Sequence, residues 1–508
     1  MFTPDQPGFS GGARRKPTAV VIGSGFGGLA AAVRLGARGY QVTVLERLDA
    51  PGGRAYVHRE AGFTFDAGPT IVTAPFLLEE LWALCGKRLS DDVELVPMDP
   101  FYNIRFADGA TFACSADRQA MRAEVERFSP GEADNFDAFL KMSEAIYRIG
   151  FEQLGDAPFN SLMDMARVAP DLLRLQGYRS VYGLVSRYFR DERLRTIFSF
   201  HPLLIGGNPF RASSIYCLIA FLEKTFGVHS AMGGTGALVN GLVKLIDGQG
   251  GLLRFNADVK RILVENGSAC GVELESGERI AADIVVSNAD SAFTYRHLLA
   301  GKPRQRWTDA KLKRASYSMG LFVWYFGLNR RYDDIAHHTI LMGPRYRALL
   351  KDIFQNKILA EDFSLYLHRP TATDPSLAPP GCDSFYVLSP VPNLQGGQDW
   401  SVEAEPYRQR IEAWLEANLL PDLSRHLVVS KVATPLDFQH RLNASHGEGF
   451  GLEPLLLQSA WFRPHNRSEE VRNLFLVGAG VHPGAGLPGV LSSARVLDKV
   501  APHASAFA

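Results

Sequence analysis

Near the N-terminus, a short apolar run is followed by closely spaced glycines and then by a helical pattern. Thr18–Ile22 is rich in β-branched residues and ends at Gly23, as a buried strand does. Apolar residues continue at helical spacing from Leu29 to Leu35, and Gln41–Leu45 has the pattern of a second strand. The sequence therefore predicts a strand, a turn, a helix and a strand, which is the beginning of a sheet covered by helices.

The turn between the first strand and the helix contains the pattern GxGxxG. Gly23 permits the tight turn, Gly25 lets the backbone approach a pyrophosphate at the helix N-terminus, and Gly28 lets the helix pack closely on the strand. Glu46 follows about 20 residues later, where a carboxylate accepts both ribose hydroxyls and repels a 2′-phosphate. This pattern predicts a dinucleotide site and disfavours NADP.

Two further segments near the N-terminus and one at the C-terminus favour FAD over NAD. Pro51-Gly52-Gly53-Arg54 brings bare backbone and an arginine to the pyrophosphate, and Phe63–Thr70 reads as a strand that ends in a rigid turn. Near the C-terminus, a strand over residues 473–477 leads through a glycine-rich turn into a helix over 488–500, whose dipole suits an anionic ring such as a reduced flavin. The predicted cofactor-binding residues are Gly23, Gly25, Gly28, Glu46, Gly53, Arg54, Gly68, Pro69, Thr70, Gly478, Gly480, Pro488, Gly489 and Val490.

Composition narrows the class of protein. Apolar residues make up 46% and charged residues 21%, which is typical of a globular chain and excludes a mainly disordered or fibrous one. Lys+Arg and Asp+Glu are both 54, so no cationic surplus favours nucleic acid as a partner. The five cysteines are far apart and include no CxxC, which suits reduced thiols. No run approaches the ~18 apolar residues of a membrane-spanning helix.

Candidate catalytic groups are few. Asp164 lies between two methionines with Arg167 nearby, so it is a candidate polar group in an apolar setting, although a helix-surface ion pair is the more ordinary interpretation. His337 and His338 are adjacent, so we expect their side chains to diverge. Neither an HxxxH pattern nor a carboxylate partner accompanies them as a further metal ligand. We predict no metal site.

These segments together resemble the bacterial-type phytoene desaturases of the carotenoid and retinoid oxidoreductase family. The similarity extends over nearly the whole chain and includes residues 21–29, 51–56, 63–70, 198–209, 233–239, 287–290, 361–368, 461–467 and 476–490. It implies a noncovalent FAD enzyme that removes hydrogen from phytoene, or a related C40 polyene, to form neurosporene- or lycopene-type products. It also implies that Val259 lies beside the adenine, that quinone or oxygen accepts the electrons, and that the enzyme binds peripherally to the cytoplasmic face of a membrane.

The resemblance implies an α/β fold of the amine-oxidase type, in which a substrate domain of α+β structure is inserted into a discontinuous Rossmann-like FAD domain. We expect a disordered tail over 1–16, FAD-binding segments over 17–114, 228–291 and 473–508, and substrate-domain segments over 115–227 and 292–472. We expect membrane contact at a basic run over 302–314, helped by apolar residues 321–326. Three alternatives remain open: a desaturase of hydroxylated or shorter carotenoids, an FAD amine oxidase, and a non-catalytic flavoprotein.

Overall fold

A parallel five-stranded sheet forms the centre of the molecule. The computed structural model describes residues 15–507, so most of the predicted tail over 1–16 lies outside the described residues. The strand order in the sheet is β19-β13-β1-β2-β9, and every neighbouring pair is parallel. The strands are β1 (Thr18–Ile22), β2 (Gln41–Leu45), β9 (Leu252–Arg254), β13 (Ile284–Ser287) and β19 (Leu474–Leu476). Three segments far apart in the sequence thus build one sheet, as predicted.

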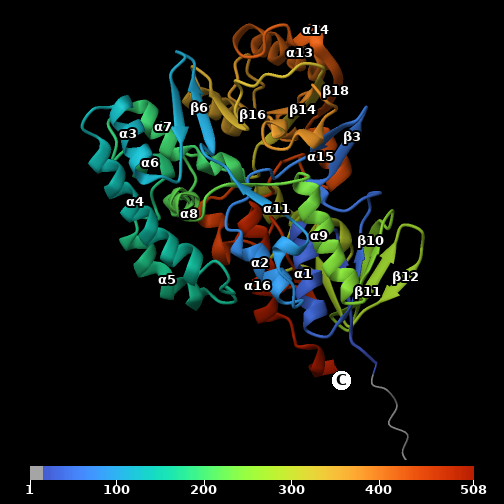
Figure 1. Cartoon of the computed structure of the whole chain (residues 1–508). Helices are drawn as coiled ribbons and strands as arrows, with labels where there is room; N and C mark the ends of the chain where they lie inside the picture. Colours follow the sequence, from blue (N-terminus) through green and yellow to red (C-terminus); the bar gives the residue numbers. More distant parts are fainter. Residues whose placement is uncertain (1–14, 508) are drawn as a thin grey trace, which may run out of the picture.

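Both faces of this sheet are covered, which explains why β1 is apolar throughout. Ala19 and Val21 pack with the helices on one face, whereas Val20 and Ile22 pack with a small antiparallel sheet on the other (Figure 1). The helices are α1 (Phe26–Ala37), α2 (Phe76–Ala83), α9 (Thr235–Gly248) and α16 (Leu487–Val500); the small sheet is β10 (Val259–Glu265), β11 (Ser268–Leu274) and β12 (Arg279–Ala281).

A second, seven-stranded sheet lies above the first in Figure 1 and has the order β18-β14-β17-β16-β15-β6-β7. Apolar side chains on one of its faces pack against α13 (Trp400–Asn418), and those on the other face contribute to the largest core cluster. The strands are β6 (Tyr102–Phe106), β7 (Thr111–Cys114), β14 (Gly320–Leu328), β15 (His338–Met342), β16 (Leu365–His368), β17 (Asp383–Val391) and β18 (Leu427–Ala433).

Two predictions are corrected by this sheet. All nine residues of β14 are buried, so residues 321–326 cannot enter a membrane interface as we expected. The boundary predicted at residue 114 is also wrong, because β6 pairs with β15 and brings residues 102–114 into the seven-stranded sheet. Conversely, Trp307 and Leu452 pack in the core cluster under the parallel sheet, so parts of the predicted segment 292–472 belong with the FAD-binding half.

A lobe of helices at the left of Figure 1 completes the molecule. It consists of α3 (Arg118–Phe128), α4 (Ala133–Tyr147), α5 (Leu162–Arg174), α6 (Val181–Val185), α7 (Glu192–Ser199) and α8 (Leu218–Phe226). No residue of α5 is buried, although the helix carries several large apolar side chains. Within residues 15–507, no helix is both long and apolar enough to cross a bilayer.

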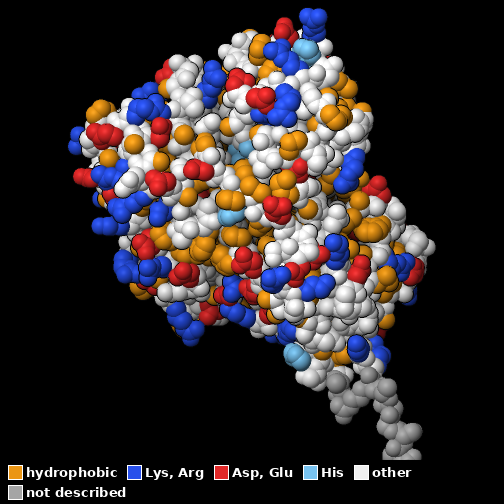
Figure 2. Space-filling model, viewed as in Figure 1, with side chains coloured by type: hydrophobic (Ala, Val, Ile, Leu, Met, Phe, Trp, Pro, Cys, Tyr) orange, Lys and Arg blue, Asp and Glu red, His pale blue; other side chains and the backbone are white. Residues whose placement is uncertain are grey.

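Short elements connect these layers. Two short antiparallel pairs are β3 (Val57–Glu60) with β4 (Phe63–Asp66), and β5 (Leu95–Pro97) with β8 (His229–Ala231). Phe63 and Phe65 of β4 pack in the core cluster of the seven-stranded sheet. The remaining helices are α10 (Ser291–Phe293), α11 (Asp309–Arg314), α12 (Tyr346–Lys351), α14 (Leu423–His426) and α15 (Pro435–Leu442). Lys, Arg, Asp and Glu side chains are interspersed over the visible face, and apolar side chains gather in its middle (Figure 2).

Asp66, at the end of β4, joins the antiparallel pair to α9. Its Oδ2 atom accepts a hydrogen bond of 3.0 Å from the backbone N–H of Thr235, the first residue of α9, and its Oδ1 atom has no partner. Burial raises the pKa of Asp66 from 3.8 to about 6, although hydrogen bonds from Thr235 and Gly236 oppose the rise. The folded protein therefore holds this proton at a pH at which the unfolded chain has released it.

We expect Asp66 to make the protein less stable as the pH rises from about 4 to about 6. The unfolded state binds fewer protons in this range, so the free energy of unfolding decreases by on the order of 2–3 kcal/mol. Asp66→Asn keeps an oxygen for Thr235 and should remove this part of the pH dependence. Urea unfolding of both proteins at several pH values measures it; equal slopes for the two proteins would contradict the assignment.

Candidate cofactor and substrate site

The turn after β1 is tightly packed against α1. Gly23 has a φ of 90°, which favours glycine, and its N–H donates to the Leu45 carbonyl at 2.8 Å. A Cβ on Gly28 would lie 2.1 Å from the carbonyl oxygen of Gly23, so only glycine lets the helix come this close. The N-terminus of α1 consequently points from the carboxyl end of β1 into a cavity, where its free N–H groups can bind an anion.

Two later glycine-rich loops lie against this turn. The N–H of Gly52 donates to the Ser24 carbonyl at 3.0 Å, and Gly25 and Gly52 form a parallel bridge. A Cβ on Gly68 would lie 2.1 Å from the Arg54 carbonyl oxygen. The three predicted segments around Gly25, Arg54 and Gly68 are therefore nested backbone to backbone, which sequence spacing alone did not show.

Glu46 directly follows β2 at the same edge of the sheet and lines the same cavity. One carboxylate oxygen, Oε2, accepts hydrogen bonds from the Ser24 N–H at 2.9 Å and from the Ser24 hydroxyl at 2.6 Å. The other, Oε1, accepts from the Leu48 N–H at 2.9 Å. These bonds hold the carboxylate beside the glycine turn, where the sequence predicts the ribose.

Asn288, which follows β13 directly, has a position that the sequence analysis did not single out. Its Nδ2 atom donates to the Gly23 carbonyl at 3.4 Å. A Cβ on Gly27 or on Gly478 would lie 2.6 or 2.5 Å from the Asn288 Oδ1 atom. Asn288 thus wedges between the N-terminal and C-terminal glycine-rich segments. Its place after a strand, at the carboxyl end of a parallel sheet, was the signal that could have identified it.

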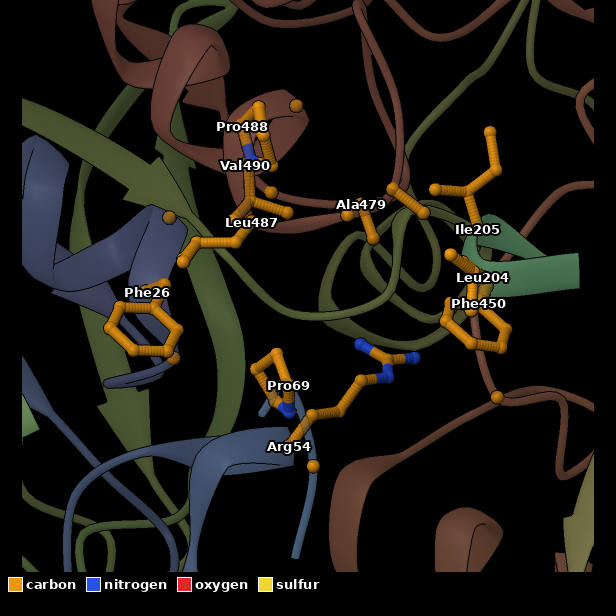
Figure 3. A pocket seen from close by; sticks show the side chains of 18 of the residues that line it. Phe26, Arg54, Pro69, Leu204, Ile205, Phe450, Ala479, Leu487, Pro488 and Val490 are labelled. Atoms are coloured by element: carbon orange, nitrogen blue, oxygen red, sulfur yellow. The ribbon is translucent and has the colours of Figure 1, made fainter. Parts of the chain in front are cut away.

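The glycine-rich turn before α16 closes the cradle from the other side. Gly484 and Gly486 have φ values of 132° and 90°, and a Cβ on Gly489 would lie 2.5 Å from the Gly484 carbonyl oxygen. Helix α16 begins at Leu487, so its N-terminus opens into the cavity. Figure 3 shows Leu487, Pro488 and Val490 on one side of the cavity, opposite Arg54 and Pro69.

The nested loops surround one large cavity with a volume of about 530 Å³. Most of the predicted cofactor residues line it, namely Gly23, Gly25, Glu46, Gly53, Arg54, Gly68, Pro69, Thr70, Val259, Gly478, Pro488, Gly489 and Val490. Gly28 and Gly480 do not: both are packing positions, and a Cβ on Gly480 would lie 2.7 Å from the Ser291 hydroxyl oxygen. The cavity extends from Val259 on the nucleotide side to apolar side chains of the helical lobe.

Arg54 carries a positive charge that faces the cavity from the cradle. Its side chain extends from beside Pro69 toward the side of the cavity where Phe450 lies (Figure 3), and none of its nitrogen atoms has a hydrogen-bond partner among the described residues. Burial lowers the pKa of Arg54, and the negative charges of Asp290 and Glu448 counteract this effect. An unpartnered guanidinium beside two helix N-termini fits an anionic dinucleotide such as FAD.

Beyond the cradle, the wall of the cavity is mainly apolar. The helical lobe contributes side chains of α5 and α8, and the seven-stranded sheet contributes Leu321, Ile340 and Leu388. Leu204, Ile205 and Phe450 lie across the cavity from Phe26 (Figure 3). This part of the cavity can hold a long hydrocarbon chain.

The structure does not bring Asp164 to this cavity. Asp164 is the third residue of α5, where its carboxylate accepts hydrogen bonds from Ser161 and Asn160 and forms an ion pair with Arg167 at 3.2 Å. These bonds lower the pKa of Asp164. Its neighbours Met165 and Val168 line the cavity instead. The geometry is that of a helix cap, and the catalytic role stays a prediction without structural support.

The expectation that His337 and His338 diverge is wrong. Both are buried, their ring centroids lie 4.4 Å apart, and His368 of the neighbouring strand β16 joins them. The third histidine comes from a strand that pairs with β15, which spacing in the sequence could not reveal. The three side chains are close enough to share a ligand, so the prediction of no metal stays untested.

Comparison with known proteins defines the class to which this fold and site belong. The profile of the family described as "Flavin containing amine oxidoreductase" matches residues 26–496. A solved structure of a putrescine oxidase variant has a TM-score of 0.65 over 97% of this chain and all of that one, at 14% identity. The chain belongs to the flavin-containing amine oxidoreductase family, and its cofactor is FAD.

More similar relatives place the chain within this family. It is 52% identical over 491 residues to a neurosporene-forming phytoene desaturase of Cereibacter sphaeroides, covering 96% of this chain and 95% of the relative. It is 51% identical over 481 residues to a lycopene-forming phytoene desaturase of Pantoea ananas, covering 94% and 98%. The resemblance to the bacterial-type phytoene desaturases is therefore confirmed over nearly the full length of the chain.

Proposed function

We propose that this enzyme uses FAD to desaturate phytoene in successive steps to neurosporene- or lycopene-type products. The observation that carries the proposal is the single cavity in which the FAD cradle continues without interruption into an apolar space. A hydrocarbon that enters this space can bring an unreactive C–C bond to the cofactor while water is excluded.

The chain's own residues bind the cofactor, orient the substrate and exclude water from both. Desaturation removes a hydride and a proton from adjacent carbons, and FAD, when bound, supplies the acceptor for the hydride. Arg54 and the N-termini of α1 and α16 line the cavity and would stabilise the negative charge that a bound FAD carries or gains. The apolar walls hold the polyene along the cavity, so that one C–C bond after another can be placed beside the cofactor.

The alternatives weighed from the sequence differ in what the cavity would have to bind. An amine oxidase must hold an ammonium or amine group, whereas the apolar part of this cavity is built mainly from Leu, Ile, Met and Phe. Both named relatives have phytoene in their names, which supports this substrate over hydroxylated or shorter carotenoids. The amine oxidase similarity at 14% identity supports the fold only.

Anaerobic incubation of the FAD-loaded enzyme with phytoene in liposomes tests the proposal. Chromatography and absorption spectra should show new polyenes that absorb at longer wavelengths, together with bleaching of the flavin. Unchanged phytoene beside oxidation of an amine or a hydroxylated carotenoid would contradict it. A yellow protein that oxidises none of these compounds would support a non-catalytic flavoprotein.

We propose further that the enzyme binds the membrane surface through α5, rather than through the basic run at 302–314. Leu162, Met163 and Leu173 of α5 are 61–66% exposed. Leu457, which shortly precedes the Ala460–Phe462 turn that contacts α5, is 70% exposed. Other residues of α5 line the cavity, so this helix separates the cavity from solvent. Arg167 and Arg174 lie exposed on the same helix and suit anionic headgroups. A substrate dissolved in lipid could then enter the cavity directly.

Flotation with anionic liposomes should reveal this contact. Inserting Met163 and Leu173 into lipid gains about 1.5–3 kcal/mol per side chain, so Met163→Asp combined with Leu173→Asp should reduce liposome binding at least about tenfold. Val402→Asp is the matched control, because Val402 is 65% exposed on α13, which packs on the seven-stranded sheet. Equal flotation of both variants would exclude α5 as the contact.

A peripheral position on the cytoplasmic face would also give the enzyme access to a lipid-soluble electron acceptor. We propose a quinone as this acceptor, with oxygen as the alternative. Quinone in the same liposomes should restore the flavin absorbance after anaerobic bleaching. Recovery only upon admission of oxygen would instead identify oxygen.

A further inference from the structure

Hydrogen-bonded hydroxyl groups form a polar strip in the cavity wall, between the FAD cradle and the seven-stranded sheet. The Thr70 hydroxyl oxygen lies 2.7 Å from that of Tyr386 and 3.0 Å from that of Tyr366. The Tyr366 hydroxyl lies 2.7 Å from Nδ1 of His338. Thr70, Tyr366 and Tyr386 line the cavity, whereas His338 lies behind them and is 2% exposed. Four segments of the chain thus form one path from the cavity into the protein.

Counting the hydroxyl hydrogens shows in which direction the hydrogen bonds along this path are donated. If Tyr386 donates to Thr70, Thr70 to Tyr366, and Tyr366 to His338, each hydroxyl hydrogen has an acceptor. Only Nε2 of His338 then lacks a partner among the described residues. In the reverse direction the Tyr386 hydroxyl hydrogen would lack an acceptor as well, because among the described residues this hydroxyl is hydrogen-bonded only to Thr70. The first direction leaves fewer buried groups unpaired, so Nδ1 of His338 is the final acceptor.

The surroundings of His338 keep it neutral and allow it to accept a proton. Burial and the neighbouring rings of His337 and His368 lower the pKa of His338 well below its usual range, so its Nδ1 lone pair is free at neutral pH. The Tyr102 ring lies 6.1 Å from the His338 ring, and the Tyr102 hydroxyl donates to the buried Glu223 carboxylate at 2.7 Å. This carboxylate can balance a positive charge that arises briefly on His338.

We propose that Tyr366 takes up the proton released from the substrate and that His338, as its positioning partner, receives the hydroxyl proton of Tyr366. The proposal rests on the proposed desaturase function, which requires one proton to leave for each double bond formed. Apart from Thr70 and Tyr386, the cavity wall around Tyr366 is mainly apolar. The Glu223 carboxylate also lines the cavity, but its two oxygens are engaged by the Tyr102 hydroxyl at 2.7 Å and by Nε2 of His201 at 3.2 Å. A cation on a polyene is a very strong acid, so a neutral tyrosine supported by histidine is a sufficient base.

Atoms and electrons balance in this step. The hydride leaves one carbon for the oxidised cofactor, and the C–H bond of the adjacent carbon then breaks. Its electron pair forms the second bond of the new C=C, and its proton bonds to the Tyr366 oxygen while the original hydroxyl proton moves to Nδ1 of His338. Reoxidation by the proposed quinone takes up two electrons and two protons, and it returns Tyr366 and His338 to their starting state.

The test compares three variants of the FAD-loaded enzyme. Tyr366→Phe removes the acceptor, and His338→Gln keeps a hydrogen-bond acceptor that cannot hold a proton. Tyr407→Phe is the matched control, because the Tyr407 hydroxyl also makes a buried hydrogen bond, 2.8 Å to that of Ser389, but packs on the other face of the seven-stranded sheet, away from the cavity. FAD content is measured first, and flavin bleaching by phytoene is then followed anaerobically over a single turnover in H2O and in D2O.

We expect Tyr366→Phe and His338→Gln to retain FAD and to slow bleaching about 10²–10⁴-fold, the usual contribution of a positioned base. The wild type should show a normal solvent isotope effect that Tyr366→Phe abolishes, and Tyr407→Phe should behave as the wild type. A wild-type rate in either test variant that retains FAD would overturn the proposal. Failure of the wild type itself to bleach with phytoene would overturn the proposed function, and this inference with it.

Discussion

Gly25→Val should yield a folded protein that retains no FAD. A Cβ at position 25 would lie 3.0 Å from Nδ2 of Asn288, and the remaining side-chain atoms would occupy the place where the backbone approaches the pyrophosphate. Overpacking of this kind costs about 1–3 kcal/mol, and the displaced phosphate contacts add to it. We therefore expect the Kd for FAD to rise by more than about a hundredfold.

Visible flavin absorbance per purified chain measures the loss of FAD, and circular dichroism reports whether the chain is folded. Gly248→Val is the matched control, because a Cβ on Gly248 meets no atom within 4 Å and this glycine has a helical φ at the end of α9. The control should keep its flavin. Normal flavin content in Gly25→Val would exclude this loop as the pyrophosphate site.

Arg54→Met should weaken FAD binding by about 1.5–3 kcal/mol, roughly tenfold to a hundredfold in Kd. The guanidinium faces the cavity without a protein partner, so its hydrogen bonds are available to the cofactor alone. Methionine has a similar length and keeps the apolar packing of the stem. The loss should therefore appear in cofactor affinity while the free energy of unfolding of the apoprotein changes little.

Titration of the apoprotein with FAD, followed by flavin fluorescence, measures this effect. Arg54→Lys should recover only part of the affinity, because an ammonium group lacks the planar fork of the guanidinium. Arg279→Met is the control, since Arg279 lies exposed on the small antiparallel sheet and pairs with Glu273. An unchanged Kd for Arg54→Met would show that the arginine does not contact the cofactor.

The FAD-binding half could be predicted because its signals are local. The glycines of the first turn, the acidic residue after β2 and the glycines before α16 each meet a backbone requirement within a few residues. Helix and strand boundaries there agree closely with the sequence pattern, as β1 over Thr18–Ile22 and β2 over Gln41–Leu45 show. Local steric demands of this kind are present in the sequence before any tertiary contact forms.

The substrate half could be predicted less well, because an apolar run does not show what covers it. The run at 321–326 suited a membrane surface, yet it is the centre of a sheet that is buried on both faces. The side chains of α5 had no distinguishing pattern beyond an amphipathic helix, yet they separate the cavity from solvent. Burial is decided by the partner that packs on a face, and the partner is distant in the sequence.

By itself, the sequence determined the dinucleotide cradle, the discontinuous α/β plan and, through its resemblance to known relatives, the flavin family. Only the tertiary structure decided that Asp164 caps a helix outside the cavity, that Asn288 joins two glycine-rich segments, and that Thr70, Tyr366 and His338 share one hydrogen-bonded path. The physical reason is the same in each case. A turn is specified by neighbouring residues, whereas a hydrogen bond across 296 residues exists only after the strands that carry its atoms have packed together.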